Sequence, residues 1–313
     1  MFLMIAAAAA LSMPASAQDA PPPAPPTAVP ATVTETAIAG FPRARLYSLP
    51  GAAARPVVVI LPGAEGGDGA GKRFGPVLAR LGYAAVSLPY YSPAWGPTMP
   101  PPEFPDLPGS FVDIRVDQLA TLRAALAKMP GVDAGRFGLF AGSKGAEFAL
   151  IAASRYDWID AVVAYAPSDL VWEGWGLETI KAEGTRSSFA ADGKALPFMP
   201  YRGFTEGLLN PAKADLRAIH ENGRADHPER EAAARIPVER YRGRLMLVAG
   251  DEDKLWNSGR MARNIAASRT KAGLGTEALP YPEAGHDLGG GSATPRADAW
   301  PKAMTFLKDA LKP

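Results

Sequence analysis

Apolar, β-branched runs alternate with amphipathic stretches along most of this chain. The run RPVVVILPG, at residues 55–63, contains five consecutive apolar residues, which is typical of a strand buried on both faces of a sheet. Between Val112 and Met129, apolar residues recur three or four positions apart, as one face of a helix requires. The patterns predict strands at 31–40, 43–50, 55–63, 83–90, 135–142, 161–167, 243–250 and 276–282, and helices at 72–81, 111–129, 146–154, 257–271 and 296–311.

The order of these elements predicts an α/β fold. Strands and helices alternate, which implies one mostly parallel central sheet with helices on both faces. Residues 168–240 interrupt the alternation and are rich in Trp, Phe, Gly and charged residues. An insertion at this point leaves the sheet at the carboxyl end of a strand, where open α/β sheets bind ligands. We therefore expect residues 168–240 to form a cap over a site.

The first 31 residues differ in composition from the rest of the chain. MFLMIAAAAALSMPASAQ is an apolar run that ends in a small-x-small pattern at residues 15–17, which predicts a signal peptide at 1–17 and export to the periplasm or the medium. No Lys or Arg precedes the run, and a frayed N-terminal helix on a cytoplasmic protein is the alternative. Residues 18–31 are proline-rich and predict an extended linker. We expect residues 32–313 to form the remaining folded domain, which includes the insertion at 168–240.

Charge and cysteine content exclude several classes of function. Lys and Arg number 33 and Asp and Glu 32, for a net charge of +1, which does not favour nucleic acid or an acidic membrane surface as a partner. The chain has no cysteine, which excludes disulfides, a lipoprotein anchor and a cysteine nucleophile. No compact cluster of His and carboxylates has the spacing of a metal site. We expect no metal, no cofactor and no stable membrane anchor after signal cleavage.

The segment AGSKG, at residues 141–145, places Ser143 between an expected strand and an expected helix. A nucleophile elbow needs such a strand-turn-helix, with small residues around the serine so that strand and helix can cross closely. Ala141, Gly142 and Gly145 meet this requirement. The alternative is that Ser143 only caps the helix.

A serine hydroxyl is a weak nucleophile and needs a base. Of the three histidines, His286 follows the last expected strand, where the base belongs when the chain order is Ser, Asp, His. His220 and His227 lie in the polar segment RAIHENGRADHPER of the insertion, and we expect both to be solvated. The orienting acid should follow the preceding strand, within the segment GDEDK. We choose Asp253, with Asp251 as the fallback, and expect Glu252 to be a solvated loop charge.

An oxyanion needs backbone N–H donors. One is expected at Lys144, directly after the nucleophile, and the other in the loop LPGAEGG at Ala64 or, as second choice, Glu65. The alternative is that this loop is a plain glycine turn. We expect the Lys144 side chain to point to solvent near Glu147, three residues along the helix.

Three aromatic side chains of the insertion, Trp172, Trp175 and Phe198, are candidates for the wall of a substrate pocket. Such a wall changes the preference for acyl chain length, because each methylene in an apolar pocket is worth about 1 kcal/mol. The alternative is that these aromatics only pack the insertion onto the core.

Four segments resemble a known family: AGSKGAEFALIAAS, VVAYAPSDLVWEGW, IPVERYRGRLMLVAGDEDKLWNS and YPEAGH. They are similar to the catalytic domain of the acyl-CoA thioesterase and bile-acid-CoA:amino acid N-acyltransferase family, within the α/β-hydrolase fold. The resemblance covers residues 55–311 and implies Ser143 as nucleophile, Asp253 as acid and His286 as base. This chain departs from the family in two ways. Fewer than 40 residues lie between the expected cleavage site and the first core strand, so we do not expect the family's N-terminal β-sandwich domain here, and serine stands where the amidating members use cysteine.

These features together predict a serine hydrolase that cleaves a small-molecule carboxylic ester or thioester through an acyl-serine. Because CoA esters are cytosolic, export favours a simple ester as substrate. One alternative is an acyl-CoA thioesterase or acyltransferase of fatty-acyl metabolism. Another is a catalytically inactive hydrolase domain that serves as a binding protein.

Overall fold

A computed structural model describes residues 32–51, 53–94, 101–176, 186–204, 207, 214–288 and 294–313. Residues Thr32–Pro313 form one compact unit. The expected signal peptide (1–17) and linker (18–31) lie outside the described residues. Within the described ranges, no helix combines the length and the apolar character needed to span a membrane.

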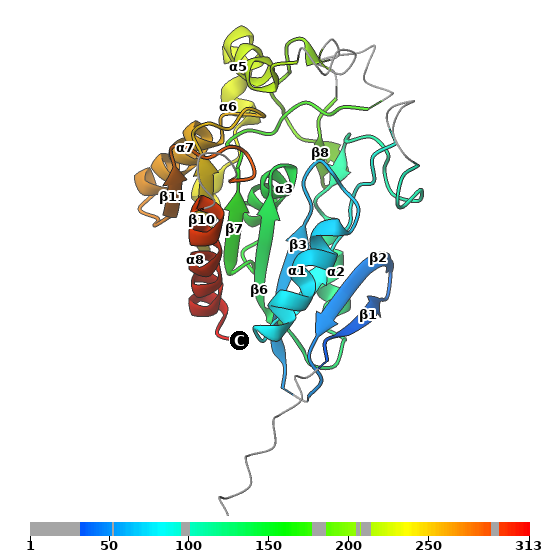
Figure 1. Cartoon of the computed structure of the whole chain (residues 1–313). Helices are drawn as coiled ribbons and strands as arrows, with labels where there is room; N and C mark the ends of the chain where they lie inside the picture. The colour runs from blue at the N-terminus through cyan, green and yellow to red at the C-terminus, as the bar shows by residue number, and fades with distance from the viewer. Residues whose placement is uncertain are drawn as a thin grey trace, which may run out of the picture. The chain divides into compact units, whose positions relative to one another are not determined.

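The described residues form a central sheet of eight strands (Figure 1). The two pairings nearest one edge of this sheet are antiparallel, and all its other pairings are parallel. The prediction of a mostly parallel sheet is therefore confirmed. In spatial order the strands are β1 (Thr34–Ile38), β2 (Phe41–Ser48), β4 (Ala84–Ser87), β3 (Arg55–Leu61), β6 (Val132–Gly142), β7 (Ala161–Tyr165), β10 (Arg244–Gly250) and β11 (Glu277–Tyr281).

Helices cover both faces of this sheet. Along β3, Val58 and Ile60 pack toward α1 (Gly69–Arg80) and α8 (Thr294–Leu311). Their neighbours in β3 point the other way, because successive side chains of a strand alternate between faces. On that second face lie α2 (Gln118–Leu126), α3 (Lys144–Ala153) and α7 (Ser258–Lys271).

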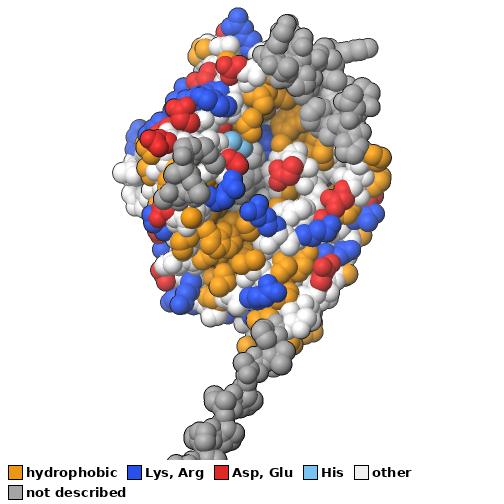
Figure 2. Space-filling model, in the orientation of Figure 1, with side chains coloured by type: hydrophobic (Ala, Val, Ile, Leu, Met, Phe, Trp, Pro, Cys, Tyr) orange, Lys and Arg blue, Asp and Glu red, His pale blue; other side chains and the backbone are white. Residues whose placement is uncertain are grey.

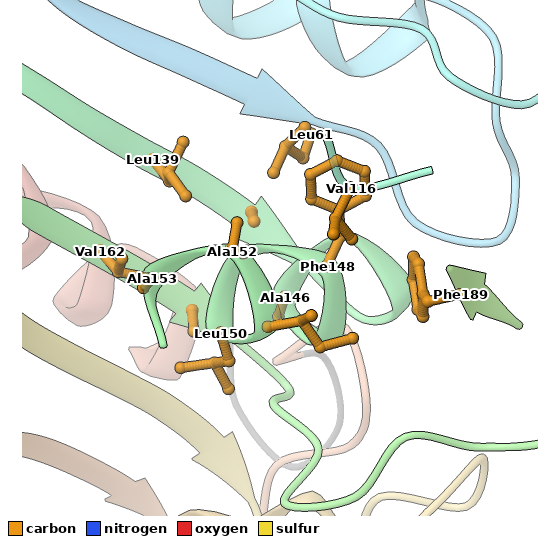
Figure 3. Close-up of a cluster of buried hydrophobic side chains, with 14 of the residues drawn as sticks. Leu61, Val116, Leu139, Ala146, Phe148, Leu150, Ala152, Ala153, Val162 and Phe189 are labelled. Carbon is orange, nitrogen blue, oxygen red and sulfur yellow. The ribbon is translucent and has the colours of Figure 1, made fainter. Parts of the chain in front are cut away.

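The core beneath α3 explains why this helix carries almost no polar residues. Figure 3 shows Ala146, Phe148, Leu150, Ala152 and Ala153 of α3 against the strands. Leu61, Leu139 and Val162 face them from three different strands. Because α3 is buried on all sides, its first residue, next to Ser143, has little freedom to move.

The predicted helix 111–129 is wrong over its first half. Residues Ile114–Arg115 form a strand, β5, and the helix α2 covers only Gln118–Leu126. The N–H groups of Ile114 and Val116 donate to carbonyls of residues 188 and 190, in and beside β8 (Phe189–Ala191). The apolar residues 112, 114 and 116 also fit a period of two, so the sequence pattern was compatible with either element.

The described parts of residues 168–240 lie at the carboxyl end of the sheet (Figure 1). In the described chain, β5, β8 and β9 (Lys194–Ala195) form a second, three-stranded sheet there. They are accompanied by α5 (Leu216–Asp226), α6 (Glu231–Ala234) and the 3₁₀ turns Pro228–Arg230 and Val238–Arg240. The insertion thus stands at the end of the sheet where the chain leaves β6 for α3.

Candidate active site

Ser143 occupies the turn between β6 and α3 in an unusual backbone conformation. Its φ is 54° and its ψ is −126°, which is strained for a residue with a side chain. Its N–H donates to the carbonyl of Tyr165 at the end of β7, at 2.9 Å. Its side chain makes no capping hydrogen bond to α3. The turn therefore holds the hydroxyl away from the helix, as a nucleophile elbow does.

Glycines beside Ser143 allow the close crossing that the elbow requires. A Cβ on Gly145 would lie 2.4 Å from the carbonyl oxygen of Leu61 and 2.5 Å from that of Pro62. A Cβ on Gly63 would lie 3.2 Å from the Cβ of Ser143. The start of α3 is thus in direct contact with the end of β3, and only small residues fit between them.

His286 and Asp253 are joined by a hydrogen bond. The distance from His286 Nδ1 to Asp253 Oδ2 is 2.8 Å, although the residues come from different loops, after β11 and after β10. Asp253 is fully buried, and its Oδ1 accepts the N–H groups of Leu255 at 2.9 Å and Trp256 at 3.2 Å. Burial works to raise the pKa of Asp253, but the hydrogen bond and the charge of His286, with hydrogen bonds from Ser258 and Leu255, outweigh it and hold the pKa below its usual value. The carboxylate is therefore kept charged next to the imidazole.

The other two acids of the loop face elsewhere. Asp251 pairs with Arg263 of α7, at 2.7 Å. Glu252 is exposed and pairs with Lys254, at 2.9 Å. Of the three acids considered from the sequence, Asp253 is the one that contacts His286.

Ser143 and His286 line the same cavity, which has a volume of about 690 Å³. His286 Nε2 is buried and has no hydrogen-bond partner within the described ranges. No bond from Ser143 Oγ to this nitrogen is formed among the described residues, and such bonds are often long in unliganded enzymes. The structure thus brings the serine, the histidine and, behind it, Asp253 to one site.

Most of the cavity wall is apolar. Its apolar side chains come from α1, α8, the strands between them and the loop after β11, and none of them was predicted from the sequence to be a site residue. The sequence gives little indication of these lining residues, because side chains that line a groove and side chains in a core follow the same hydrophobic pattern. Figure 2 shows hydrophobic side chains gathered between α1 and α8, with Lys and Arg at the border of this area. The wall includes Ile60, Leu61, Ala70, Phe74, Val77, Phe140, Tyr165, Leu288 and Trp300, with Glu65, Arg73, Asp287 and Arg296 as its charged members.

The expected N–H donors lie near this cavity. Lys144 is the first residue of α3, and the first N–H groups of a helix have no partner within the helix. The loop after β3 closes with a bond from Gly66 N–H to the carbonyl of Gly63, at 3.1 Å, which places Ala64 and Glu65 at the centre of a turn. Glu65 lines the cavity, while Ala64 packs partly against the core. The roles of these N–H groups stay a prediction.

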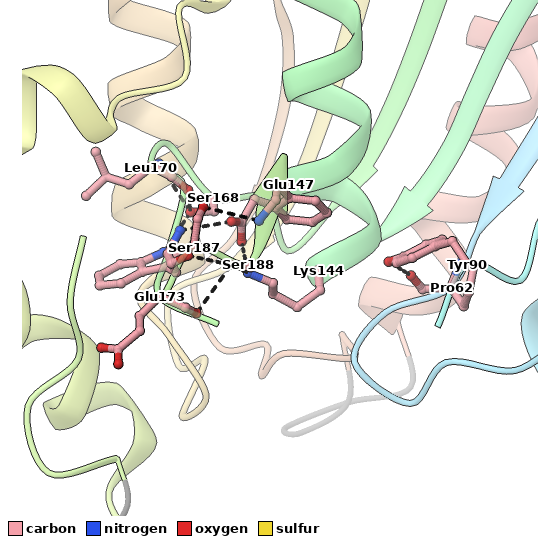
Figure 4. A network of polar contacts seen from close by, with 11 residues as sticks. Pro62, Tyr90, Lys144, Glu147, Ser168, Leu170, Glu173, Ser187 and Ser188 are labelled. Carbon is pink, nitrogen blue, oxygen red and sulfur yellow. Dashed lines mark hydrogen bonds and ion pairs between the residues drawn. The ribbon is translucent and has the colours of Figure 1, made fainter. Parts of the chain in front are cut away.

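The Lys144 side chain is buried, so the expectation that it points to solvent is wrong. Its Nζ lies 2.6 Å from Glu147 Oε2 and 2.9 Å from Ser188 Oγ (Figure 4). The rings of Phe111, Trp175 and Phe189 surround it, with centroids 5.0–5.3 Å away. The expected partner, Glu147, is correct, but segments distant in sequence cover the pair.

His220 is also buried, so the expectation that it is solvated is wrong. Its Nδ1 donates to the carbonyl of Leu216 at 2.6 Å, and its ring packs against Trp172, Tyr201 and Trp256. Burial lowers the pKa of His220 to about 4. The helix α5 is amphipathic, and His220 lies on the face that packs inward. His227, at the end of α5, has a side chain that is 41% exposed.

Trp172, Trp175 and Phe198 are buried, with exposed fractions of 0%, 6% and 8%. The Trp172 ring stacks on Tyr201, and Trp175 stacks on Phe111. None of the three lines the cavity that contains Ser143, as the described residues define it. Their role in substrate binding stays a prediction. Nor does any group of three His, Cys, Asp or Glu side chains in the described part of the chain have the geometry of a metal site.

Comparisons with known proteins agree with this fold. Residues 123–290 match the family described as BAAT / Acyl-CoA thioester hydrolase C terminal. Acyl-coenzyme A thioesterase 6 of Mus musculus is 28% identical over 250 residues, which cover 79% of this chain and 52% of that protein. The chain thus spans about half the length of this curated relative.

Solved structures with similar folds include several hydrolases. A Klebsiella pneumoniae protein described as a dienelactone hydrolase has a TM-score of 0.57 at 13% identity, covering 88% of this chain and 98% of that one. A puromycin-hydrolyzing peptidase of Mycobacterium tuberculosis has a TM-score of 0.57 at 14% identity, covering 90% of this chain and 39% of that one. At such identities the likeness shows the fold alone, and it confirms the expected α/β-hydrolase fold.

Proposed function

The chain belongs to the BAAT / acyl-CoA thioester hydrolase C-terminal family, and on that basis we propose that it is a serine hydrolase cleaving a carboxylic ester or thioester. The observation that carries the proposal is the arrangement around one cavity. Ser143 stands on a strained turn there, and His286 enters with Nε2 free and Nδ1 bonded to a buried carboxylate.

In the proposed reaction, Ser143 Oγ attacks the carbonyl carbon of the substrate and His286 Nε2 takes the hydroxyl proton. Asp253 holds the imidazole through Nδ1 and stabilises the imidazolium that forms. The N–H of Lys144 and that of Ala64 or Glu65 bind the developing oxyanion. His286 then returns the proton to the leaving alcohol or thiol, and an acyl-serine remains.

Water is the proposed acceptor in the second half of the reaction. An acyl-serine is an oxygen ester, which amines attack less readily than the thioester that a cysteine would form. This chain has no cysteine, so its acyl-enzyme is of the oxygen type. His286 activates a water molecule, which attacks the acyl carbon and releases the acid and free Ser143.

A covalent probe tests the nucleophile. A fluorophosphonate should label the wild-type protein and the variant Ser154→Ala, in which a serine at the other end of α3 is removed. It should not label Ser143→Ala. The kcat of Ser143→Ala should fall by a factor on the order of 10⁴ or more. Equal labelling of Ser143→Ala and wild type would refute the assignment.

The leaving group and the location of the protein are linked. We propose that the protein is exported, on the basis of its N-terminal apolar run, and that its substrate is a simple ester. Cleavage of acyl-CoA in the cytoplasm is the second candidate, favoured by the family match and by the name of the mouse relative. Rates on p-nitrophenyl esters and acyl-CoAs, measured side by side, together with immunoblots of periplasmic and cytoplasmic fractions, separate the two.

A further inference from the structure

An apolar groove between α1 and α8 continues from Ser143 along the face of the sheet. The same cavity that contains Ser143 and His286 extends over this groove. We call it the α1–α8 groove, and it is lined by Ala70, Phe74, Val77, Phe140, Tyr165 and Trp300. In Figure 2 the hydrophobic side chains of this region form one continuous area.

Aromatic contacts hold the base of the groove in place. Phe74 of α1 stacks on Trp300 of α8, with ring centroids 5.5 Å apart. Phe140 of β6 lies edge-on to Phe74, at 5.1 Å, and to Tyr165 of β7, at 5.5 Å. Because each ring is fixed by another, the groove is preformed, as small-molecule sites usually are.

Apolar surface in the groove remains open to solvent. Val77 is 37% exposed, and Phe74, Tyr165 and Trp300 are only partly buried. At one edge of the cavity, Arg296 pairs with Asp287 at 2.6 Å, and both side chains are more than half exposed. An apolar base with a charged edge fits a ligand that has an apolar body and one polar end.

The aromatics of the insertion offer no comparable surface. Trp172 is 0% exposed and Trp175 6%, because each is packed against other rings. A substrate chain reaching them would have to displace these contacts. The groove needs no such rearrangement, since its apolar wall already lies beside Ser143.

We propose that the α1–α8 groove binds the acyl chain of the substrate, an inference that rests on the proposed acyl transfer to Ser143. The carbonyl lies at Ser143 and the methylenes run along Phe140 and Val77 between the two helices. The substrate class is then an unbranched acyl ester or thioester with several methylenes. Chain-length preference is set by α1 and α8.

A bulky residue in the groove tests this placement. In Val77→Trp, the ratio of kcat/KM for p-nitrophenyl dodecanoate to that for the butyrate should fall at least tenfold. Leu81→Trp is the matched control. It adds the same bulk just after α1, at a side chain that is 45% exposed and lies outside the cavity, and its ratio should stay within twofold of wild type.

A second measurement tests the groove even if the Val77→Trp variant does not fold. Brominated dodecanoate quenches tryptophan fluorescence at short range, and its titration into the Ser143→Ala protein should quench Trp300. The added variant Trp300→Phe should remove at least half of that quenching, whereas Trp158→Phe, a tryptophan outside the cavity, should not. Equal quenching in the two tryptophan variants would overturn the proposal.

The outcomes separate the groove from the chemistry. Hydrolysis retained by Ser143→Ala refutes the proposed function. If Ser143 is required but Val77→Trp and Leu81→Trp, both shown to fold by thermal unfolding, have the same chain-length ratio, the groove assignment alone is wrong. A ratio that shifts in Trp175→Phe but not in Val77→Trp would move the acyl site to the insertion and also overturn it.

Discussion

Lys144 Nζ and Glu147 Oε2 lie 2.6 Å apart in the interior of the protein. Lys144 directly follows Ser143, and Glu147 lies about one turn further along α3. Burial lowers the pKa of Lys144 and raises that of Glu147, and their mutual attraction opposes both shifts. Glu147 Oε1 also accepts the N–H of Trp172, at 3.0 Å. Figure 4 shows how this network joins the start of α3 to Ser188 and the insertion. The residue after Ser143 is therefore fixed by its side chain as well as by its backbone.

Breaking this pair on one side should destabilise the protein strongly. Lys144→Met leaves a buried carboxylate without its cation, and Glu147→Leu leaves a buried ammonium. Each should lower the free energy of unfolding by about 3–5 kcal/mol. The double variant should be less destabilised than the sum of the two, because neither unpaired charge remains. Urea unfolding of the four proteins measures the coupling.

An exposed ion pair on α8 provides the control for this cycle. Lys302 and Asp298 lie 2.6 Å apart with side chains 48% and 39% exposed. Lys302→Met should change the free energy of unfolding by less than about 1 kcal/mol, as is usual for exposed pairs. Single and double variants of Lys144 and Glu147 that were additive would show that the two charges do not interact.

Gly145 and Gly142 should respond very differently to alanine. Gly145→Ala places a methyl group 2.4 Å from the carbonyl oxygen of Leu61, and this backbone cannot easily move. We expect a loss of at least about 2 kcal/mol in unfolding free energy, with reduced activity because the elbow is displaced. Gly142→Ala meets nothing closer than 3.8 Å, the Cβ of Tyr165, and should be tolerated. Similar melting temperatures for both variants would argue against the close crossing.

Asp253 and Asp251 test which acid orients His286. Asp253→Asn replaces the acceptor of the 2.8 Å bond to Nδ1 with an amide, which favours the wrong imidazole tautomer. We expect kcat to fall by a factor on the order of 10⁴. Asp251→Asn alters only the pair with Arg263 and should stay within a few-fold of wild type. A larger loss in Asp251→Asn than in Asp253→Asn would reverse the assignment.

The strands and the turn at Ser143 could be predicted because local pattern determines them. A strand buried on both faces is a continuous apolar run, as in β3 and β7, whatever packs against it. The small residues around Ser143 reflect a backbone crossing that any larger side chain would block. The strands depend on residues that are close in sequence, and the turn at Ser143 depends on a backbone crossing whose geometry requires small residues.

The surroundings of Lys144 and His220 could not be predicted, because residues far away in sequence create them. Ser188 and the ring of Phe189 cover Lys144 from 44 and 45 positions along the chain. Trp172 and Trp256 enclose His220 from either side of α5 in the sequence. A polar residue in a polar segment gives no local signal that such partners exist. The α1–α8 groove was missed for a similar reason, since it depends on the spacing of two helices.

Because His220 is buried, stability should depend on pH in a particular window. Its pKa is lowered to about 4 in the folded protein, whereas an unfolded histidine titrates near ~6.5. Between these values the unfolded chain binds the proton and the folded protein does not. The contribution of neutral His220 is therefore complete above pH ~6.5 and is lost as the pH falls toward 4.

The variant His220→Gln should flatten this dependence. Between pH 7 and pH 5, wild type should lose roughly 2 kcal/mol of unfolding free energy through this group, and His220→Gln should lose that much less. His227→Gln is the control, because His227 is half-exposed and its replacement should leave the slope as in wild type. Urea unfolding at several pH values gives the slopes. If the unfolding free energies of wild type and His220→Gln depended equally on pH, His220 would have to bind protons in the folded protein as readily as in the unfolded chain. That result would contradict its packing among Trp172, Tyr201 and Trp256.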